Sequence, residues 1–347
     1  MKAFQAIAPG SGTMTEITLP VLADDQVLIR VSYCGICGTD YDLFSGNSGF
    51  ISNGQATYPI RLGHEWSGVV EKVGRSVTTL KPGDRVVGDN YVSCGVCPAC
   101  QKKDYNNCTG RHHVGTINPC WPGAFAEYYI APERHVYRLE DHVSLMEAAL
   151  CEPLSVAYGG IKKMDIAADS VVVVIGTGSI GMSAAALALY KGGQVYLVGR
   201  NADKLDVALK LGIQGVINSR EGDIVEQLLA LTGGRLADFV LECSGADQMV
   251  NASLELAAQK AKIAMIGFYS AAKLPVDVNA LVSKEITMIG IMGEYGNLEA
   301  VSRIMAEKDL HLKEIITGVV PFAECGPAFM PDKPQSVIKT IVEINKE

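Results

Sequence analysis

The strongest constraint on the fold is a run of β-branched residues that leads directly into a glycine-rich turn. Residues 171–181 read VVVVIGTGSIG. Five consecutive β-branched residues are typical of a strand buried on both faces, and Gly176, Gly178 and Gly181 have the G-x-G-x-x-G spacing. In this motif the first glycine permits a tight turn, the second lets a pyrophosphate approach, and the third lets the next helix pack on the strand. The stretch therefore predicts the first βα turn of a dinucleotide-binding unit.

The residues after this turn support the same interpretation. Residues 182–190 are rich in Ala and Leu and predict a helix, and residues 195–198 predict a second strand. Ser179 and Ile180 would then lie at the amino end of the helix, where free N–H groups and the helix dipole favour phosphate. The alternative is a glycine-rich turn that packs without binding phosphate.

The composition is that of a globular protein with room for two domains. The chain has 347 residues, of which 48% are hydrophobic and 20% charged. No apolar run approaches the roughly 20 residues of a membrane span, and the start MKAFQ does not resemble a secretory signal. The formal net charge of −8 argues against a nucleic-acid surface. We therefore expect a cytoplasmic protein that binds neither nucleic acid nor membrane.

The pattern of predicted elements changes along the chain. Short β-type runs and Gly/Pro turns fill the first 150 or so residues and predict a compact, mostly antiparallel β domain. From about residue 155 strands and helices alternate, and six strands are expected, the number typical of a doubly wound dinucleotide-binding sheet. Beyond the strands at 171–175 and 195–198, those expected lie at 216–217, 238–241, 262–266 and 285–290. The remaining chain predicts an amphipathic helix near 298–308 and a final strand at 337–343, which return to the first domain.

Four cysteines stand close together in a segment rich in Gly, Pro, Asn and Lys. Cys94, Cys97, Cys100 and Cys108 have the spacing C-x2-C-x2-C-x7-C. Four thiolates are the ligand set of a closed tetrahedral zinc site. An iron–sulfur cluster is the alternative because its cysteine spacings overlap, and a nucleic-acid zinc ribbon suits the acidic chain poorly. Because a closed site uses all four thiolates as ligands and keeps no open position, we expect this metal to be structural.

A second group of possible metal ligands comes earlier in the chain. The segment C-G-I-C-G-T-D begins at Cys34 and includes Cys37, and G-H-E places His64 and Glu65 together. A cysteine, a histidine and a carboxylate fit an open, catalytic zinc site. Glu152, in the sequence C-E-P-L, offers another carboxylate where the β domain meets the dinucleotide domain. Each of these residues taken alone is more often structural.

Taken in order, these motifs resemble those of the zinc-dependent medium-chain alcohol dehydrogenase family. The resemblance covers nearly the whole chain, and the Glu-Pro pair at 152–153 is similar to the polyol (sorbitol) dehydrogenase, ketose reductase and threonine dehydrogenase branch. It implies an α/β protein with a GroES-like β-rich catalytic domain and a Rossmann domain, and an active site in the cleft between them. The expected ranges are 1–154 and 291–347 for the catalytic domain, and 155–290 for the Rossmann domain.

The resemblance also implies the roles of individual residues. Cys37, His64 and Glu65 would be ligands or near-ligands of a catalytic zinc, with Glu152 reaching it directly or through water. Thr39 would relay the substrate proton, and Cys34 would be structural. Zinc would acidify the bound alcohol, and a hydride would pass to the nicotinamide. We therefore expect two zinc ions per chain, and a homodimer or homotetramer formed through the apolar strand at 286–292.

The cofactor is indicated by the end of the strand at 195–198. Where the family usually has an acidic residue that binds the ribose, this chain has Gly199 and Arg200, and Lys204 follows one turn later. An acidic side chain would repel a 2′-phosphate, whereas a glycine leaves room and an arginine binds it bidentately. NADP(H) is therefore favoured. The alternative is that Arg200 faces solvent and the enzyme uses NAD(H).

The expected reaction is hydride transfer between NADP(H) and a secondary alcohol or ketone, with a polyol, sugar alcohol or ketose as substrate. Amino alcohols, as in threonine dehydrogenases, and sugar-phosphate polyols are alternative substrates. A cofactor-binding regulatory protein without turnover, or a zinc-free quinone reductase on the same fold, would tolerate loss of Cys37, His64 or Thr39. All three residues are present. An enzyme is therefore the favoured interpretation.

Overall fold

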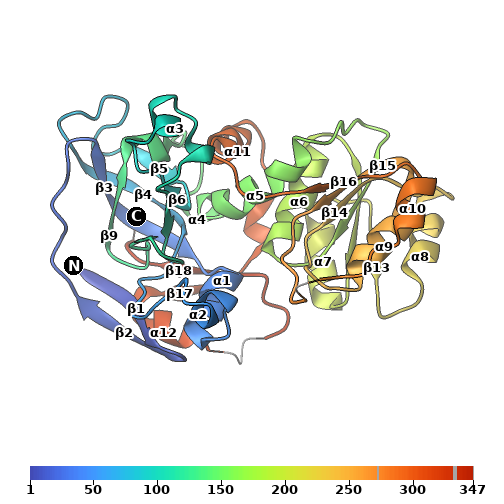
Figure 1. Ribbon diagram of the computed structural model, residues 1–347, viewed down its shortest axis with the longest axis horizontal. Helices are drawn as coiled ribbons and strands as arrows, with labels where there is room; N and C mark the ends of the chain where they lie inside the picture. Colours follow the sequence, from blue (N-terminus) through green and yellow to red (C-terminus); the bar gives the residue numbers. More distant parts are fainter. Residues whose placement is uncertain (272, 331–333, 347) are drawn as a thin grey trace.

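Two lobes, each built on its own large sheet, make up the protein (Figure 1). The computed structural model describes residues 1–271, 273–330 and 334–346. Helix α5 (Cys151–Ile161) lies between the lobes and packs against α6 (Ser179–Tyr190) and α11 (Asn297–Glu307). Within the described residues, no helix has both the length and the apolar character needed to cross a membrane.

The first lobe contains a seven-stranded sheet in the order β10-β5-β4-β3-β18-β17, with β9 also paired to β3. All its pairings are antiparallel except that between β17 and β18, which confirms the mostly antiparallel β lobe. The sheet strands are β3 (Gln26–Gly35), β4 (Glu65–Val73), β5 (Arg85–Gly88), β9 (Tyr128–Pro132), β10 (Val136–Arg138), β17 (Ile316–Pro321) and β18 (Lys339–Glu343). Val342 of β18 is the partner of Cys34 on β3, so the last strand lies in the middle of the first lobe.

The second lobe contains a parallel sheet of six strands in the order β13-β12-β11-β14-β15-β16. The chain starts at β11, adds strands on one side and then crosses to the other, which confirms the doubly wound Rossmann arrangement. The strands are β11 (Val171–Ile175), β12 (Gln194–Gly199), β13 (Gly215–Asn218), β14 (Ala237–Glu242), β15 (Ala257–Met265) and β16 (Thr287–Gly290). Strand β15 starts five residues earlier than the sequence pattern predicts because it follows helix α9 (Met249–Leu256) without a loop.

Successive residues of β11 point to opposite faces of the parallel sheet, as the pleat requires. Val172 and Val174 belong to a core that includes α5, α6 and α7, whereas Val171 and Val173 belong to a core with α8 and α9. All four side chains are fully buried. The continuous β-branched run therefore fits a strand covered on both faces. The helices of this lobe are α6, α7 (Ala202–Lys210), α8 (Ile224–Thr232), α9 (Met249–Leu256) and α10 (Val278–Ser283).

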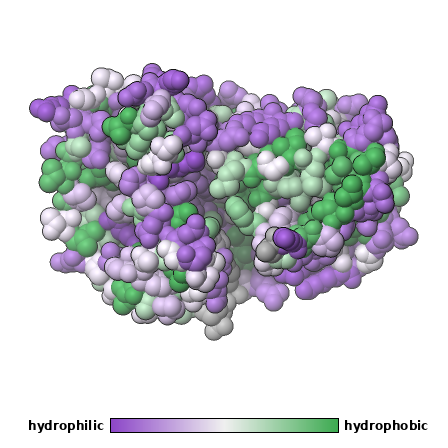
Figure 2. Space-filling model, viewed as in Figure 1, coloured by the Kyte–Doolittle hydropathy of each residue, from purple (hydrophilic) through white to green (hydrophobic). Residues whose placement is uncertain are grey.

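Smaller elements surround the antiparallel sheet and form the outer parts of the first lobe. A hairpin at the amino terminus and a three-stranded sheet beside the four-cysteine segment are the main additions. These elements are β1 (Lys2–Ala8), β2 (Ser11–Glu16), α1 (Gly38–Ser45), α2 (Gly49–Ser52), β6 (Tyr91–Val92), α3 (Pro98–Gln101), β7 (His112–Val114), β8 (Cys120–Trp121), α4 (Leu145–Ala148) and α12 (Cys325–Ala328). The surface is hollowed between the two lobes in the view of Figure 2.

Candidate active site

The glycine-rich turn lies where the strand order of the parallel sheet reverses. It joins β11, which has β12 on one side and β14 on the other, to helix α6. Gly176 has φ +117°, a conformation that favours glycine. A Cβ at Gly181 would lie 1.9 Å from the carbonyl oxygen of Gly176, whereas a Cβ at Gly178 would meet nothing within 4 Å. The turn therefore combines close helix packing with open space over the amino end of α6. Ser179 and Ile180 at this end are half-buried. The open space over the helix end fits a pyrophosphate.

Two cationic residues follow the end of β12. Arg200 is exposed, and Lys204 is half-buried in the first turn of α7. Burial, and then the positive charge of Arg200, lower the pKa of Lys204. Two neighbouring cations repel each other unless an anion lies between them, so this arrangement suits a ribose 2′-phosphate.

Gly199 also has a packing role, which its place in the sequence did not reveal. The sequence suggested that this glycine leaves room for a phosphate. In the structure a Cβ at Gly199 would lie 2.4 Å from Cγ2 of Thr177 and 3.0 Å from Cδ2 of Leu205. The glycine is therefore also required by the contact between the end of β12 and the glycine-rich turn.

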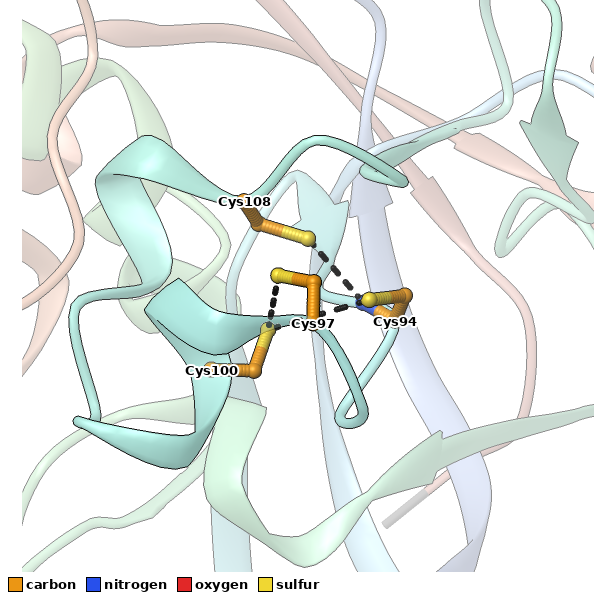
Figure 3. A group of neighbouring side chains, drawn as sticks. All are labelled: Cys94, Cys97, Cys100 and Cys108. Carbon is orange, nitrogen blue, oxygen red and sulfur yellow. Dashed lines mark hydrogen bonds between the residues drawn. The ribbon is translucent and has the colours of Figure 1, made fainter.

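The four cysteines of the first lobe converge on one point (Figure 3). Their sulfur atoms all lie within 4.8 Å of one another. The Sγ atoms of Cys97 and Cys100 are 3.5 Å apart, and those of Cys94 and Cys100 are 3.9 Å apart. Tetrahedral zinc with Zn–S bonds of about 2.3 Å places its sulfurs about 3.8 Å apart. The geometry therefore fits a closed four-thiolate metal site.

Backbone N–H groups favour the thiolate form of Cys94 and Cys97. The N–H of Cys94 donates to Sγ of Cys108 at 3.3 Å. N–H groups of Cys100 and Thr109 lower the pKa of Cys97 to about 6. Burial raises the pKa of Cys100 to about 11. Because metal ligands must be deprotonated, the backbone hydrogen bonds favour metal binding at Cys94 and Cys97, whereas Cys100 would lose its proton only to a bound cation.

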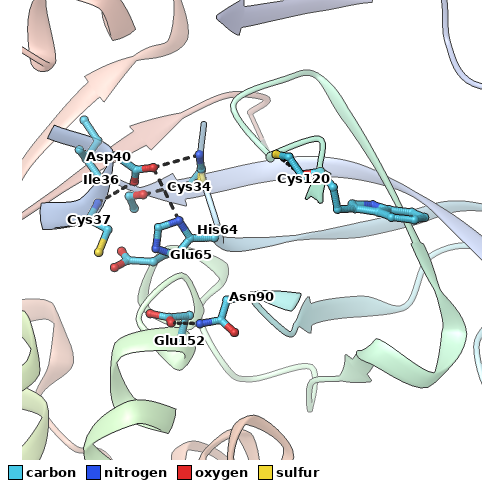
Figure 4. Close-up of polar contacts among 12 residues, drawn as sticks. Cys34, Ile36, Cys37, Asp40, His64, Glu65, Asn90, Cys120 and Glu152 are labelled. Atoms are coloured by element: carbon cyan, nitrogen blue, oxygen red, sulfur yellow. Dashed lines mark hydrogen bonds and ion pairs between the residues drawn. The ribbon is translucent and has the colours of Figure 1, made fainter. Parts of the chain in front are cut away.

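The second predicted group also comes together. Cys37 precedes α1, His64 lies just before β4, and Glu65 is the first residue of β4. One ligand atom of each lies within 4.8 Å of the others (Figure 4). His64 and Glu65 are buried and Cys37 is half-buried. This set of one sulfur, one nitrogen and one carboxylate fits an open zinc site.

Asp40 holds the two chain segments of this group together. Its carboxylate accepts hydrogen bonds from the N–H of Cys37 at 2.9 Å and of Gly63 at 3.2 Å. Its Oδ1 lies 3.6 Å from Nδ1 of His64, a buried atom without a hydrogen-bond partner in the described structure. Burial opposes a charged imidazole, but Asp40 and then Cys37 outweigh it and raise the pKa of His64. A carboxylate behind a metal-binding histidine is a common orienting device, and no pattern in the sequence pointed to Asp40 for this role.

Glu152, Thr39 and Cys34 lie around this group. Glu152, in the first turn of α5, is buried and accepts a hydrogen bond from Nδ2 of Asn90 at 2.6 Å. Burial raises the pKa of Glu152 to about 7. It stands outside the tight group formed by Cys37, His64 and Glu65. Thr39 is half-buried in α1, and Cys34 is fully buried in β3.

Lys339 is the site residue that the sequence gave no reason to expect. It begins β18, and its side chain is 1% exposed. Its Nζ donates to both carboxylate oxygens of Glu65, at 2.8 and 2.5 Å, and to the carbonyl oxygen of Ile36 at 3.0 Å. Because 274 residues separate Lys339 from Glu65, no local pattern could have connected them.

Two family descriptions match this chain in order. Residues 23–141 match the alcohol dehydrogenase GroES-like domain, and residues 179–307 match the zinc-binding dehydrogenase family. The chain is 31% identical over 354 residues to D-arabitol-phosphate dehydrogenase of Enterococcus avium, covering 100% of this chain and 98% of the relative. The chain belongs to the zinc-type medium-chain alcohol dehydrogenase family.

Other members of this family resemble the chain over its full length. It is 32% identical to sorbitol dehydrogenase of Halalkalibacterium halodurans, with 99% of each chain covered. A crystal structure from Sinorhizobium meliloti 1021, bound to NADP, superposes with a TM-score of 0.88 at 27% identity and 99% coverage of both chains. The fold and the oxidoreductase class expected from the sequence are therefore confirmed, and the chain lies in the polyol dehydrogenase branch.

Proposed function

We propose that this protein is a zinc-dependent dehydrogenase that transfers a hydride between NADP(H) and a secondary alcohol or ketone of the polyol class. The convergence of Cys37, His64 and Glu65 carries this proposal. Glu152 lies on α5, and the glycine-rich turn leads into α6. Because α5 packs directly on α6, these two features connect that group to the cofactor lobe. The metal-ligand group and the dinucleotide site thus meet at the junction of the two lobes.

Cys37 and His64 would hold a zinc ion, with Glu65 and Glu152 as nearby carboxylates. The residues fit this ion because His64 Nδ1 faces Asp40, which leaves the other ring nitrogen for a metal. Bound zinc acts as a Lewis acid that makes a substrate hydroxyl more acidic. The hydroxyl of Thr39 would pass the released proton towards solvent. Cys94, Cys97, Cys100 and Cys108 would hold a second, structural zinc.

NADP(H) is the proposed cofactor because Arg200 and Lys204 form a cationic pair at the end of β12. The open space over Gly178 and the amino end of α6 would receive the pyrophosphate. Gly176, Gly181, Ser179 and Ile180 would shape this part of the site. The NADP bound to the Sinorhizobium meliloti relative supports the preference.

The substrate class rests on the relatives. One is named sorbitol dehydrogenase and another D-arabitol-phosphate dehydrogenase, so a sugar alcohol, free or phosphorylated, is the proposed substrate, with the matching ketose as product.

We further propose that residues 155–290 form the cofactor domain, and that residues 1–154 and 291–347 form the catalytic domain.

The substrate and cofactor can be tested together. Zinc-loaded protein would be assayed with a panel of sugar alcohols, polyol phosphates and amino alcohols, each with NADP and with NAD. We expect the highest kcat/KM for a polyol or polyol phosphate with NADP. A higher kcat/KM for an amino alcohol such as threonine, or no turnover across the panel, would contradict the proposal.

A further inference from the structure

A cavity of about 440 Å³ opens on the β-rich lobe, and it shares no residue with the proposed zinc and cofactor sites. Figure 4 shows Cys120, which lines the cavity, well apart from the group formed by Cys37, His64 and Glu65. The cavity lies between the amino-terminal hairpin, the segment before His64 and the loop around residues 116–122. Its polar lining residues are Gln5, Thr57, Tyr58, Arg61, Thr116, Asn118 and Cys120.

Among the residues that the structure describes, Arg61 is the only charged one that lines this cavity. Its side chain is half-buried, and its Nε atom is enclosed without a hydrogen-bond partner in the described structure. Among the described residues, no carboxylate forms an ion pair with it. Burial lowers the pKa of Arg61, which reflects the cost of removing an unpaired charge from water. An anion in the cavity would offset this cost.

Thr57 and Gln5, which also line the cavity, have donor groups that their own hydrogen bonds leave available. Thr57 Oγ1 accepts a hydrogen bond from Nδ2 of Asn118 at 3.3 Å, so its own proton can be donated elsewhere. Gln5 uses its carbonyl oxygen to accept from Thr15 at 3.4 Å, which leaves its amide N–H groups as donors. A cavity lined by a guanidinium together with hydroxyl and amide donors is suited to phosphate or carboxylate oxygens.

We propose that this cavity binds an oxyanion, a phosphate or carboxylate group, with Arg61 as its principal contact. The cavity volume accommodates a small free anion or the charged end of a larger metabolite. Arg61 stands three residues before His64, so a ligand there would also fix the segment that leads to the proposed zinc ligand.

Calorimetric titration of the full-length, zinc-loaded protein with inorganic phosphate tests this site. Because Arg200 and Lys204 also attract phosphate, the titration uses the Arg200→Ala/Lys204→Ala background without cofactor, at constant ionic strength. We expect one saturable site per chain with a Kd on the order of 1 mM or tighter. Adding Arg61→Met should weaken binding at least tenfold, and Arg61→Lys should weaken it less. Adding Arg75→Met, at an exposed arginine of the same lobe outside the cavity, should change nothing.

Two further arms sharpen the result. Thr57→Val leaves Arg61 in place and should weaken phosphate binding at least threefold, which keeps the test decisive if Arg61→Met does not fold. Glucose 6-phosphate binding at least tenfold tighter than phosphate, in an Arg61-dependent way, would identify a larger phosphorylated ligand. Equal affinities would identify a free oxyanion. Absence of saturable binding, or an Arg61→Met affinity within twofold of the background protein, would overturn the proposal.

Discussion

Nζ of Lys339 lies 2.8 Å from Oε1 of Glu65, although the two residues are 274 positions apart in the sequence. Both side chains are 1% exposed. The pair therefore ties the last strand of the chain to the proposed catalytic zinc site. Lys339 donates from β18 to the Glu65 carboxylate and thereby sets where this carboxylate lies relative to Cys37 and His64.

We expect Lys339→Met to lower the free energy of unfolding by about 3–5 kcal/mol, because it leaves a buried carboxylate without its partner. The double variant Lys339→Met/Glu65→Gln should recover a large part of that loss, since it removes both charges. Urea unfolding of the wild type, Lys339→Met, Glu65→Gln and the double variant, all loaded with zinc, would give the interaction energy of the pair. A single variant within 1 kcal/mol of the wild type would show that the pair contributes little.

Arg200 should determine the choice of cofactor. One charge-assisted bidentate contact is worth about 1.5–3 kcal/mol, so Arg200→Ala should raise KM for NADP roughly ten- to a hundredfold and leave KM for NAD nearly unchanged. Lys210→Ala, an exposed cation at the other end of α7, is the matched control. Equal effects of Arg200→Ala on both cofactors would show that this arginine only faces solvent.

Conversion to NAD use should need two changes. Gly199→Asp would offer the ribose an acceptor and repel a 2′-phosphate, but its Cβ would overlap with Cγ2 of Thr177. We therefore expect Thr177→Ala/Gly199→Asp to use NAD better than Gly199→Asp alone, with both variants losing NADP activity. Comparison of kcat/KM for the two cofactors checks this. Identical cofactor ratios in the single and double variants would mean that Thr177 does not limit the aspartate.

The four-cysteine segment, with Cys94, Cys97, Cys100 and Cys108, should stabilise the protein without taking part in turnover. Its thiolates are all used to close one site, so Cys100→Ser should lower stability or solubility far more than it changes kcat in the folded fraction. Thermal unfolding and active-site-normalised kcat would be measured together. A Cys100→Ser variant with wild-type stability and no turnover would assign the four-cysteine segment a catalytic role.

The free edge of the parallel sheet should mediate self-association. Strand β16 is the last of the sheet, and Val278, Val282 and Met292 nearby are 61%, 67% and 62% exposed. Figure 2 shows apolar side chains gathered over this lobe. An apolar edge of this kind favours pairing with a second copy, so we expect a dimer or a dimer of dimers. Light scattering should show that Met292→Glu weakens the assembly, whereas Val21→Glu, an exposed residue of the other lobe, does not. A wild-type monomer at micromolar concentration would contradict this expectation.

The sequence predicted the parts of the protein that local patterns encode. The β-branched run at 171–175, the glycine spacing and the cysteine spacing each specify their own neighbourhood, and the structure has all three. Contacts between distant segments were not predictable in this way. The pairing of Lys339 with Glu65 depends on β18 lying beside β3, and the crowding of Gly199 depends on how Thr177 packs against β12.

The zinc content of His64→Ala tests the proposed function most directly. Wild-type protein should contain two zinc ions per chain, and His64→Ala should contain one, with nearly all turnover lost but the fold and NADP binding retained. Cys37→Ser should behave in the same way. Glu152→Ala should keep some activity because water can replace its carboxylate. Cys120→Ser is the control: Cys120 belongs to neither proposed zinc site, so this variant should retain both ions. Metal analysis by mass spectrometry, together with steady-state turnover, gives the result. A His64→Ala protein with two zinc ions and ordinary turnover would show that the catalytic zinc does not lie here.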